Sequence, residues 1–237
     1  LELHHFSSNE TRHASIYKAI DHAANFSQPG HDGYEQREPD PLMGQFWEPL
    51  DSLNRFVSTS SDADFFDPAE GITKLMDLDN AIDFHLLVLV TSNGDGITKN
   101  FILARDVRIG KSPEPKFFFV PWDYDATFGR NWNATVVPPD AWLSNHLFER
   151  LYGHVEYQKK YQARWRELRK KQFSLQTIQG AIDDNAKTLG EAIHRNNRQW
   201  RSAAGHYPDK LTFEEDVTAM KQWVAQRLEW LDKKFGL

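Results

Sequence analysis

The segment that organises this sequence reads Asn-Gly-Asp-Gly-Ile-Thr-Lys-Asn over residues 93–100. A second segment reads Pro-Trp-Asp-Tyr-Asp-Ala-Thr-Phe-Gly over residues 121–129. In the first segment Asp95 precedes Asn100 by five positions, and in the second Asp123 leads a pair of acidic residues followed by a glycine. Carboxylate and amide oxygens are suited to proton transfer and to binding hard metal ions, so these two segments are the candidate site.

The chain between the two segments predicts a β-hairpin. The predicted strands at residues 101–105 and 116–120 contain the apolar runs 101–104 and 117–120, and the stretch that joins them contains Gly110, Pro113 and Pro115. The pattern therefore predicts two short strands that carry one acidic loop at the start of the hairpin and the other at its end.

A buried helix is predicted immediately before the first acidic loop. Apolar residues from Ile82 to Val90 cover almost all sides of a helix that Asp79 is expected to cap. The cluster Ser-Asn-Gly at residues 92–94 predicts its end. Asp95 is thus expected in a loop that follows the most buried helix, which is a rigid support for a functional loop.

The remainder of the chain predicts a mainly helical α+β fold. Residues 1–45 are polar and contain several Gly and Pro residues, so they are expected to be an irregular segment with one short ordered piece near residues 14–24. Residues 46–237 are expected to form one helical domain with the small hairpin beside the loop of Asp95. Helices are predicted at residues 46–58, 67–76, 141–152, 155–171, 175–200 and 213–235.

Composition excludes several classes of protein. The chain has 237 residues, of which 40% are hydrophobic and 26% charged, as in globular domains. It has no apolar run long enough to span a membrane, and it has no cysteine for disulfides or thiolate chemistry. The net charge is −6, and a basic run covers residues 159–171. Helical spacing favours a solvated helix face for this run over a docking surface, and no nucleic-acid-binding motif accompanies it.

Each acidic residue also has a purely structural interpretation. Asn-Gly-Asp-Gly is typical of a turn, so Asp95 alone could be a turn residue. Asp123 and Asp125 could accept local backbone hydrogen bonds. They do not begin a calcium-binding loop of the EF-hand type, because the glycine is at the seventh position and the twelfth position is not Glu.

The conjunction of these parts is more informative than any one of them. A buried helix, an Asp-x4-Asn loop, a hairpin and an Asp near a Gly occur in the order that protein kinases use. The chain lacks the usual His-Arg before Asp95, and it has an expanded Asp-x-Asp-x3-Gly form in place of Asp-Phe-Gly. Both departures resemble the CotH-type atypical kinases, named for a spore-coat protein. Further resemblance comes from the helix before Asp95, the Ile-Tyr-Lys at residues 16–18, and the pattern Asn-x-Leu-x2-Arg-Leu at residues 145–151.

The resemblance implies a role for each matching residue. Asp95 would orient the acceptor hydroxyl and accept its proton. Asn100 and Asp123 would bind Mg²⁺ or Mn²⁺, and Asp125 would be a third ligand or a brace for the loop. The ATP base would stack on Phe117, with Tyr17 as a second candidate. The alternative for Phe117 is a core strand residue, and tryptophans near the acidic pair could be core anchors or a binding face.

The resemblance also implies two alternative functions. The first is an atypical protein kinase that transfers the γ-phosphoryl group of ATP to Ser or Thr of coat or secreted proteins. The second is a kinase-like scaffold that has lost activity and works in coat or surface assembly. No strand-rich segment with a phosphate-binding Lys precedes Tyr17, so we expect the small lobe to be upstream or missing. We therefore expect this chain by itself to transfer phosphate poorly.

Overall fold

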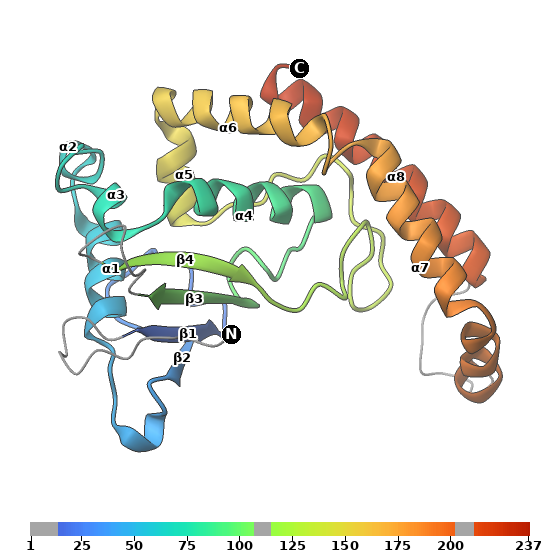
Figure 1. The fold of residues 1–237 in the computed structure, drawn as a ribbon, viewed down its shortest axis with the longest axis horizontal. Helices are drawn as coiled ribbons and strands as arrows, with labels where there is room; N and C mark the ends of the chain where they lie inside the picture. Colours follow the sequence, from blue (N-terminus) through green and yellow to red (C-terminus); the bar gives the residue numbers. More distant parts are fainter. Residues whose placement is uncertain (1–13, 107–114, 202–210) are drawn as a thin grey trace. The chain divides into compact units, whose positions relative to one another are not determined.

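The computed structural model describes residues 14–106, 115–201 and 211–237. Its elements in chain order are β1 (Ser15–Ala19), β2 (Tyr34–Glu38), the 3-10 helix η2 (Pro41–Met43), α1 (Glu48–Thr59), α2 (Asp62–Phe65), α3 (Ile72–Leu75), α4 (Leu78–Thr91), β3 (Phe101–Asp106), β4 (Lys116–Pro121), α5 (His146–Gly153), α6 (Val155–Arg169), α7 (Leu175–Asn196), the π-helix η3 (Asn197–Arg201) and α8 (Phe213–Phe235). The fold is α+β and mainly helical, as predicted (Figure 1). None of the helices in the described ranges is long and apolar enough to cross a membrane.

The described residues divide into two compact units. The first contains residues from 1–88, 94–124 and 143–158, and therefore includes the sheet, most of α4 and α5. The second contains residues from 89–93, 125–142 and 159–237, and therefore includes α7 and α8. The predicted division of the chain at residue 45 stays a prediction.

The sheet of the first unit has four antiparallel strands in the order β2-β1-β3-β4. The predicted hairpin is confirmed as β3 and β4, in which Phe101 pairs with Pro121. β1 lies within the short ordered piece expected near residues 14–24, whereas the prediction of an irregular segment up to residue 45 is wrong at β2, which pairs with β1. The two buried residues of β2 are Tyr34 and the polar Gln36, so its five positions show no apolar alternation that would predict a strand.

Helix α4 runs beside β4 (Figure 1), and its Phe84 packs on aromatic rings of the sheet. Phe84 stacks on Phe119 with ring centres 4.5 Å apart and meets Phe101 edge-on at 5.9 Å. Burial on nearly all sides of α4 confirms that it is a central helix. At its start Asp77, rather than the predicted Asp79, accepts a hydrogen bond from the backbone of Asn80.

The start of α4 also covers the edge strand β4. The amide side chain of Asn80 accepts from the nitrogen of Phe119 at 2.7 Å and donates to its carbonyl at 3.2 Å. Asp77 donates its backbone N–H to the carbonyl of Phe117 at 2.8 Å. These bonds satisfy backbone groups that an edge strand would otherwise expose, and they hold β4 against the central helix.

The helices differ from their predicted ranges mainly at their ends. α1 includes Pro49 in its first turn, where a missing N–H costs nothing. The helix predicted at residues 67–76 is only the short α3, because the Asp67 carboxylate instead accepts from two backbone N–H groups in a turn. The helix predicted from residue 141 begins at α5, where the side chain of Asn145 caps the nitrogen of Phe148.

His85, in the middle of α4, predicts a pH dependence of stability. Its side chain is fully buried, its Nε2 donates to the carbonyl of Leu143 at 2.8 Å, and burial lowers its pKa from 6.5 to about 4. Between pH 6.5 and 4 the unfolded chain therefore binds more protons at this residue than the folded chain does. The free energy of unfolding should fall by about 1.4 kcal/mol per pH unit in this range as the pH is lowered.

Urea titrations at several pH values between 7.5 and 4.5 measure this effect. The matched variant is His85→Gln, whose amide can still donate to Leu143 but does not titrate. We expect the parent to lose more stability than the variant on acidification, and parallel curves for the two proteins would contradict the assignment.

Candidate functional site

Asp95 lies in a tight turn that follows α4. Its backbone carbonyl accepts from the nitrogens of Thr98 at 3.1 Å and Lys99 at 2.8 Å. The turn is held by Asn145, whose buried side chain donates to the carbonyl of Ile97 at 2.7 Å. The carboxylate of Asp95 is 42% exposed, so a fixed turn presents a reachable acidic group.

Two basic side chains flank the carboxylate of Asp95. Lys99 Nζ lies 3.1 Å from Oδ2, and His22 Nε2 lies 3.9 Å from Oδ1. The lysine contact is an i, i+4 pair within the turn, whereas His22 comes from the loop that follows β1. Each carboxylate oxygen of Asp95 therefore has a different basic side chain within 4 Å.

Asn100 and Asp123 lie at the same end of the β3–β4 hairpin. Asn100 immediately precedes β3, and Asp123 follows β4 by two residues. Because Phe101 pairs with Pro121, the register brings these two flanking residues to neighbouring positions. Asn100 is held further by a hydrogen bond from its nitrogen to the carbonyl of Ala19 in β1 at 3.0 Å.

Both of these residues have a left-handed backbone. The φ angle is 56° at Asn100 and 60° at Asp123. Asn and Asp adopt this region more readily than most residues do. Unfavourable backbone conformations often occur at active sites and ligand-binding sites. Both side chains reach solvent, with Asn100 partly and Asp123 largely exposed.

The donor set fits a hard divalent cation that keeps part of its hydration. In the described ranges no three His, Cys, Asp or Glu side chains come together as a complete metal site. Mg²⁺ usually takes one or two carboxylates, with water and phosphate oxygens as its other ligands, and Asp123 with Asn100 meets that requirement. Asp125 is exposed and belongs to the second unit, so its role as a ligand stays a prediction.

Tyr17 and Phe117 lie inside the first unit. Tyr17 is 0% and Phe117 3% exposed, and the Tyr17 ring stacks on Trp47 at 5.5 Å. The Tyr17 hydroxyl donates to the carbonyl of Phe46, and burial raises its pKa to about 12, which keeps it protonated. This position matches the alternative of a core strand residue for Phe117, and the stacking of a nucleotide base on either ring stays a prediction.

A lysine and a tryptophan lie beside the end of the hairpin that contains Asn100 and Asp123. Lys18 of β1 places Nζ 4.7 Å from the ring centre of Trp122, the residue before Asp123. Trp122 is 47% exposed, so it is not one of the core anchors considered from the sequence. The ammonium group of Lys18 therefore lies against the residue that precedes Asp123. Its positive charge would attract an anionic ligand at this position.

The glycine of the second acidic segment has a packing role in the second unit. A Cβ at Gly129 would lie 2.5 Å from Cγ of Trp223, and the φ of +91° is also unfavourable for other residues. Trp223 donates its indole N–H to the carbonyl of Val137 at 2.7 Å. Only glycine therefore allows this close contact with α8.

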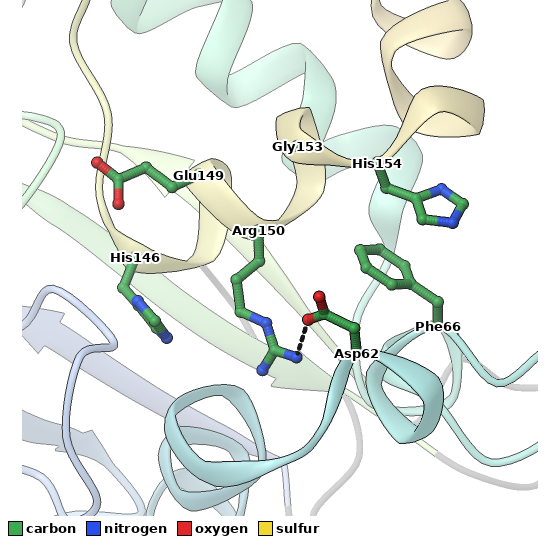
Figure 2. Close-up of a pocket in the computed structure, with 7 residues that line it drawn as sticks. All are labelled: Asp62, Phe66, His146, Glu149, Arg150, Gly153 and His154. Carbon is green, nitrogen blue, oxygen red and sulfur yellow. Dashed lines mark hydrogen bonds and ion pairs between the residues drawn. The ribbon is translucent and has the colours of Figure 1, made fainter.

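A separate pocket of about 330 Å³ lies between α2 and α5 in the first unit (Figure 2). Arg150 reaches across to Asp62 with a contact of 2.9 Å, and His154 stacks on Phe66 at 4.1 Å. The remaining lining residues are His146, Glu149 and Gly153. None of the predicted site residues lines this pocket.

Sequence reasoning did not identify His22 or the anchoring role of Asn145. Neither is near Asp95 in the sequence, and only the folded chain brings their side chains to the turn. Asn145 belongs to a motif that resembles the family, which was the one available signal for its importance.

Comparisons with known proteins agree on one family. The family model described as CotH kinase protein matches residues 2–231. The inner spore coat protein H of Bacillus subtilis (strain 168) is 33% identical over 111 residues, which is 46% of this chain. The match covers 28% of that relative, so it spans little more than a quarter of the relative's length.

Proposed function

The chain belongs to the CotH kinase protein family, and from this premise we propose that it transfers the γ-phosphoryl group of ATP to Ser or Thr hydroxyls of a protein acceptor. The observation that carries the proposal is the register of the β3–β4 hairpin. Through the pairing of Phe101 with Pro121, the loop of Asp95 and Asn100 and the loop of Asp123 are placed at one end of the same hairpin. Phosphoryl transfer requires a carboxylate for the nucleophile and oxygen ligands for the metal, and these loops contain both.

Asp95 has the role of proton acceptor in this proposal. Its carboxylate orients the acceptor hydroxyl and takes up the proton as the hydroxyl oxygen attacks phosphorus. The turn that contains it is fixed by Asn145 and by the bond of Asn100 to β1, so the carboxylate needs little rearrangement.

Asn100 and Asp123 hold the divalent cation in this proposal. Mg²⁺ or Mn²⁺, when bound, would neutralise charge on the phosphate oxygens. The two protein ligands contribute one carboxylate and one amide oxygen and leave positions for phosphate and water. Lys18, held over Trp122, is positioned to add positive charge for the phosphates.

The acceptor is proposed to be a coat or secreted protein. The matched relative is named as an inner spore coat protein, which is the support for this class of acceptor. The alternative function is a kinase-like scaffold in coat or surface assembly, and the burial of Tyr17 and Phe117 favours it, because neither ring is open to a nucleotide base.

Ligand-dependent stabilisation separates the two functions. If Asp123 binds the metal–nucleotide complex, Mn²⁺ with ATP at about 100 times the dissociation constant should raise the unfolding free energy by about 2.7 kcal/mol. Asp123→Asn should abolish this increase. Asp32→Asn, which removes an exposed carboxylate from the same unit, should retain it. An unchanged melting temperature of the parent with Mn²⁺ and ATP would favour the scaffold.

A further inference from the structure

His22 joins the loop after β1 to the turn that contains Asp95. Its Nδ1 lies 2.7 Å from the hydroxyl oxygen of Thr98, and its Nε2 lies 3.9 Å from Oδ1 of Asp95. One imidazole thus contacts two residues of a turn that lies more than seventy positions away in the sequence. Nothing in the spacing of sequence motifs indicates this contact.

The loop that contains His22 has its own fixed structure. The nitrogens of Ile20 and Asp21 both donate to the carbonyl of Gly33, at 2.8 and 3.2 Å. The side chain of Asn25 donates to the carbonyl of His22 at 3.1 Å, and Asp21 accepts from the nitrogen of Ala23 at 3.0 Å. These bonds fix the backbone from which the imidazole extends.

The loop of His22 follows β1 and the loop of Asp95 precedes β3. These are neighbouring antiparallel strands, so both loops lie at the same end of the strands. Ala19, the last residue of β1, pairs with Phe101, the first residue of β3. The carbonyl of Ala19 also accepts from the nitrogen of Asn100. The distance between His22 and Asp95 is therefore set by the strand register.

One tautomer of the His22 ring is compatible with both of its contacts. A Thr98 hydroxyl that donates to Nδ1 leaves the ring hydrogen on Nε2, which faces Oδ1 of Asp95. Lys99 holds the other oxygen, Oδ2, at 3.1 Å. At 3.9 Å the His22 contact is longer than a hydrogen bond and acts as an electrostatic one.

We propose that His22 is a positioning residue for Asp95, a role that rests on the phosphoryl transfer proposed above. Lys99 and His22 restrain the two carboxylate oxygens from opposite ends, so that Asp95 meets the acceptor hydroxyl in one orientation. His22 itself does not touch the acceptor or the nucleotide. The kcat of transfer therefore depends on His22, whereas the KM for ATP does not.

Two conservative substitutions separate the two contacts of the ring. His22→Asn places an amide where Nδ1 is, and so retains the bond to Thr98 while it removes the group that faces Asp95. His22→Gln extends an amide nitrogen toward the position of Nε2. We expect kcat to fall about 10-fold in His22→Asn and to recover to within about 3-fold of the parent in His22→Gln, with KM for ATP unchanged in both. Equal kcat values for His22→Asn and the parent would overturn the proposal.

A spectroscopic measurement tests the contact whether or not the protein transfers phosphate. In protein labelled with ¹⁵N-histidine, Asp95→Asn should move the ring nitrogen resonances of His22. The chain offers a matched control, because His31 Nδ1 lies 2.7 Å from Asp51, and Asp51→Asn should move His31 and leave His22 in place.

The two measurements distinguish the failures. If Asp95→Asn leaves the ring nitrogen resonances of His22 unchanged, the positioning role is overturned, even in an active kinase. Resonances that respond in a protein without any transfer activity would support the pairing of His22 with Asp95 and contradict the proposed function instead.

Discussion

Replacement of Asp95 by Asn is expected to lower the rate of phosphate transfer by at least about 100-fold. The substitution keeps the size of the side chain but removes the group that accepts the hydroxyl proton, and general base catalysis typically contributes 10²–10⁴-fold. The turn should survive, because the backbone carbonyl of residue 95, not its side chain, accepts the bonds from Thr98 and Lys99. Initial rates of label transfer from ATP to acceptor, at saturating Mn²⁺, measure the effect.

The control for this prediction is a carboxylate of the same unit without a role in the site. Asp32→Asn changes the net charge by the same amount at an exposed position, and its rate should equal that of the parent. The melting temperature of Asp95→Asn should stay close to that of the parent, because surface substitutions usually change stability by less than about 0.5 kcal/mol. A folded Asp95→Asn protein with an undiminished rate would show that another group accepts the proton.

Replacement of Arg227 by Met is expected to cause the largest loss of stability, about 3–5 kcal/mol of unfolding free energy. Arg227 is completely buried in the second unit, and its guanidinium donates to the carbonyls of Leu89, Pro139 and Ala141 at 2.6–2.8 Å. Its guanidinium carbon also lies 5.0 Å from the ring centre of Trp230. Met fills a similar volume but removes the guanidinium donor from all three carbonyl groups, and the Leu89 carbonyl keeps a further donor, the N–H of Ser92 at 3.3 Å.

Burial also changes the pKa of the Arg227 guanidinium. Desolvation lowers its pKa from 12.5 to about 10, so the guanidinium remains charged at neutral pH and depends on these acceptors. Arg195→Met on the exposed surface of α7 is the matched control, with an expected change below about 0.5 kcal/mol. Urea unfolding of both variants at pH 7.5 provides the comparison. A loss of less than about 1 kcal/mol in Arg227→Met would mean that water replaces the donor.

The central part of the fold was predictable because its signals are local and strong. α4 is a long apolar run that ends at a cluster of turn-forming residues, and β3 and β4 are mainly apolar strands whose connecting sequence contains Gly and Pro. β1 was expected only as a short ordered piece and β2 was missed, since the two strands depend on pairing with β3 and with each other, which no short window of sequence records. The start of α5 was placed too early, because the cap at Asn145 competes with the apolar residues before it.

The candidate site was predictable in its residues more than in its surroundings. The spacing of Asp95, Asn100 and Asp123 located the two loops, and the strand register explains why they share one end of the hairpin. The contacts that hold them, from His22 and Asn145, come from distant parts of the sequence and required the fold. The position of Tyr17 and Phe117 inside the core depends likewise on the tertiary packing around Trp47.

Metal-dependent transfer of label from γ-labelled ATP tests the central claim most directly. The protein should be assayed as this chain and as the polypeptide extended through whatever precedes Leu1 in its gene, with Mn²⁺ and with chelator, beside Asp123→Asn. We predict label on Ser or Thr in the extended protein with Mn²⁺, loss of that label with chelator and in Asp123→Asn, and weaker transfer by the shorter chain. A folded extended protein that binds no nucleotide and transfers no label to itself or to coat proteins would contradict the kinase and support the scaffold.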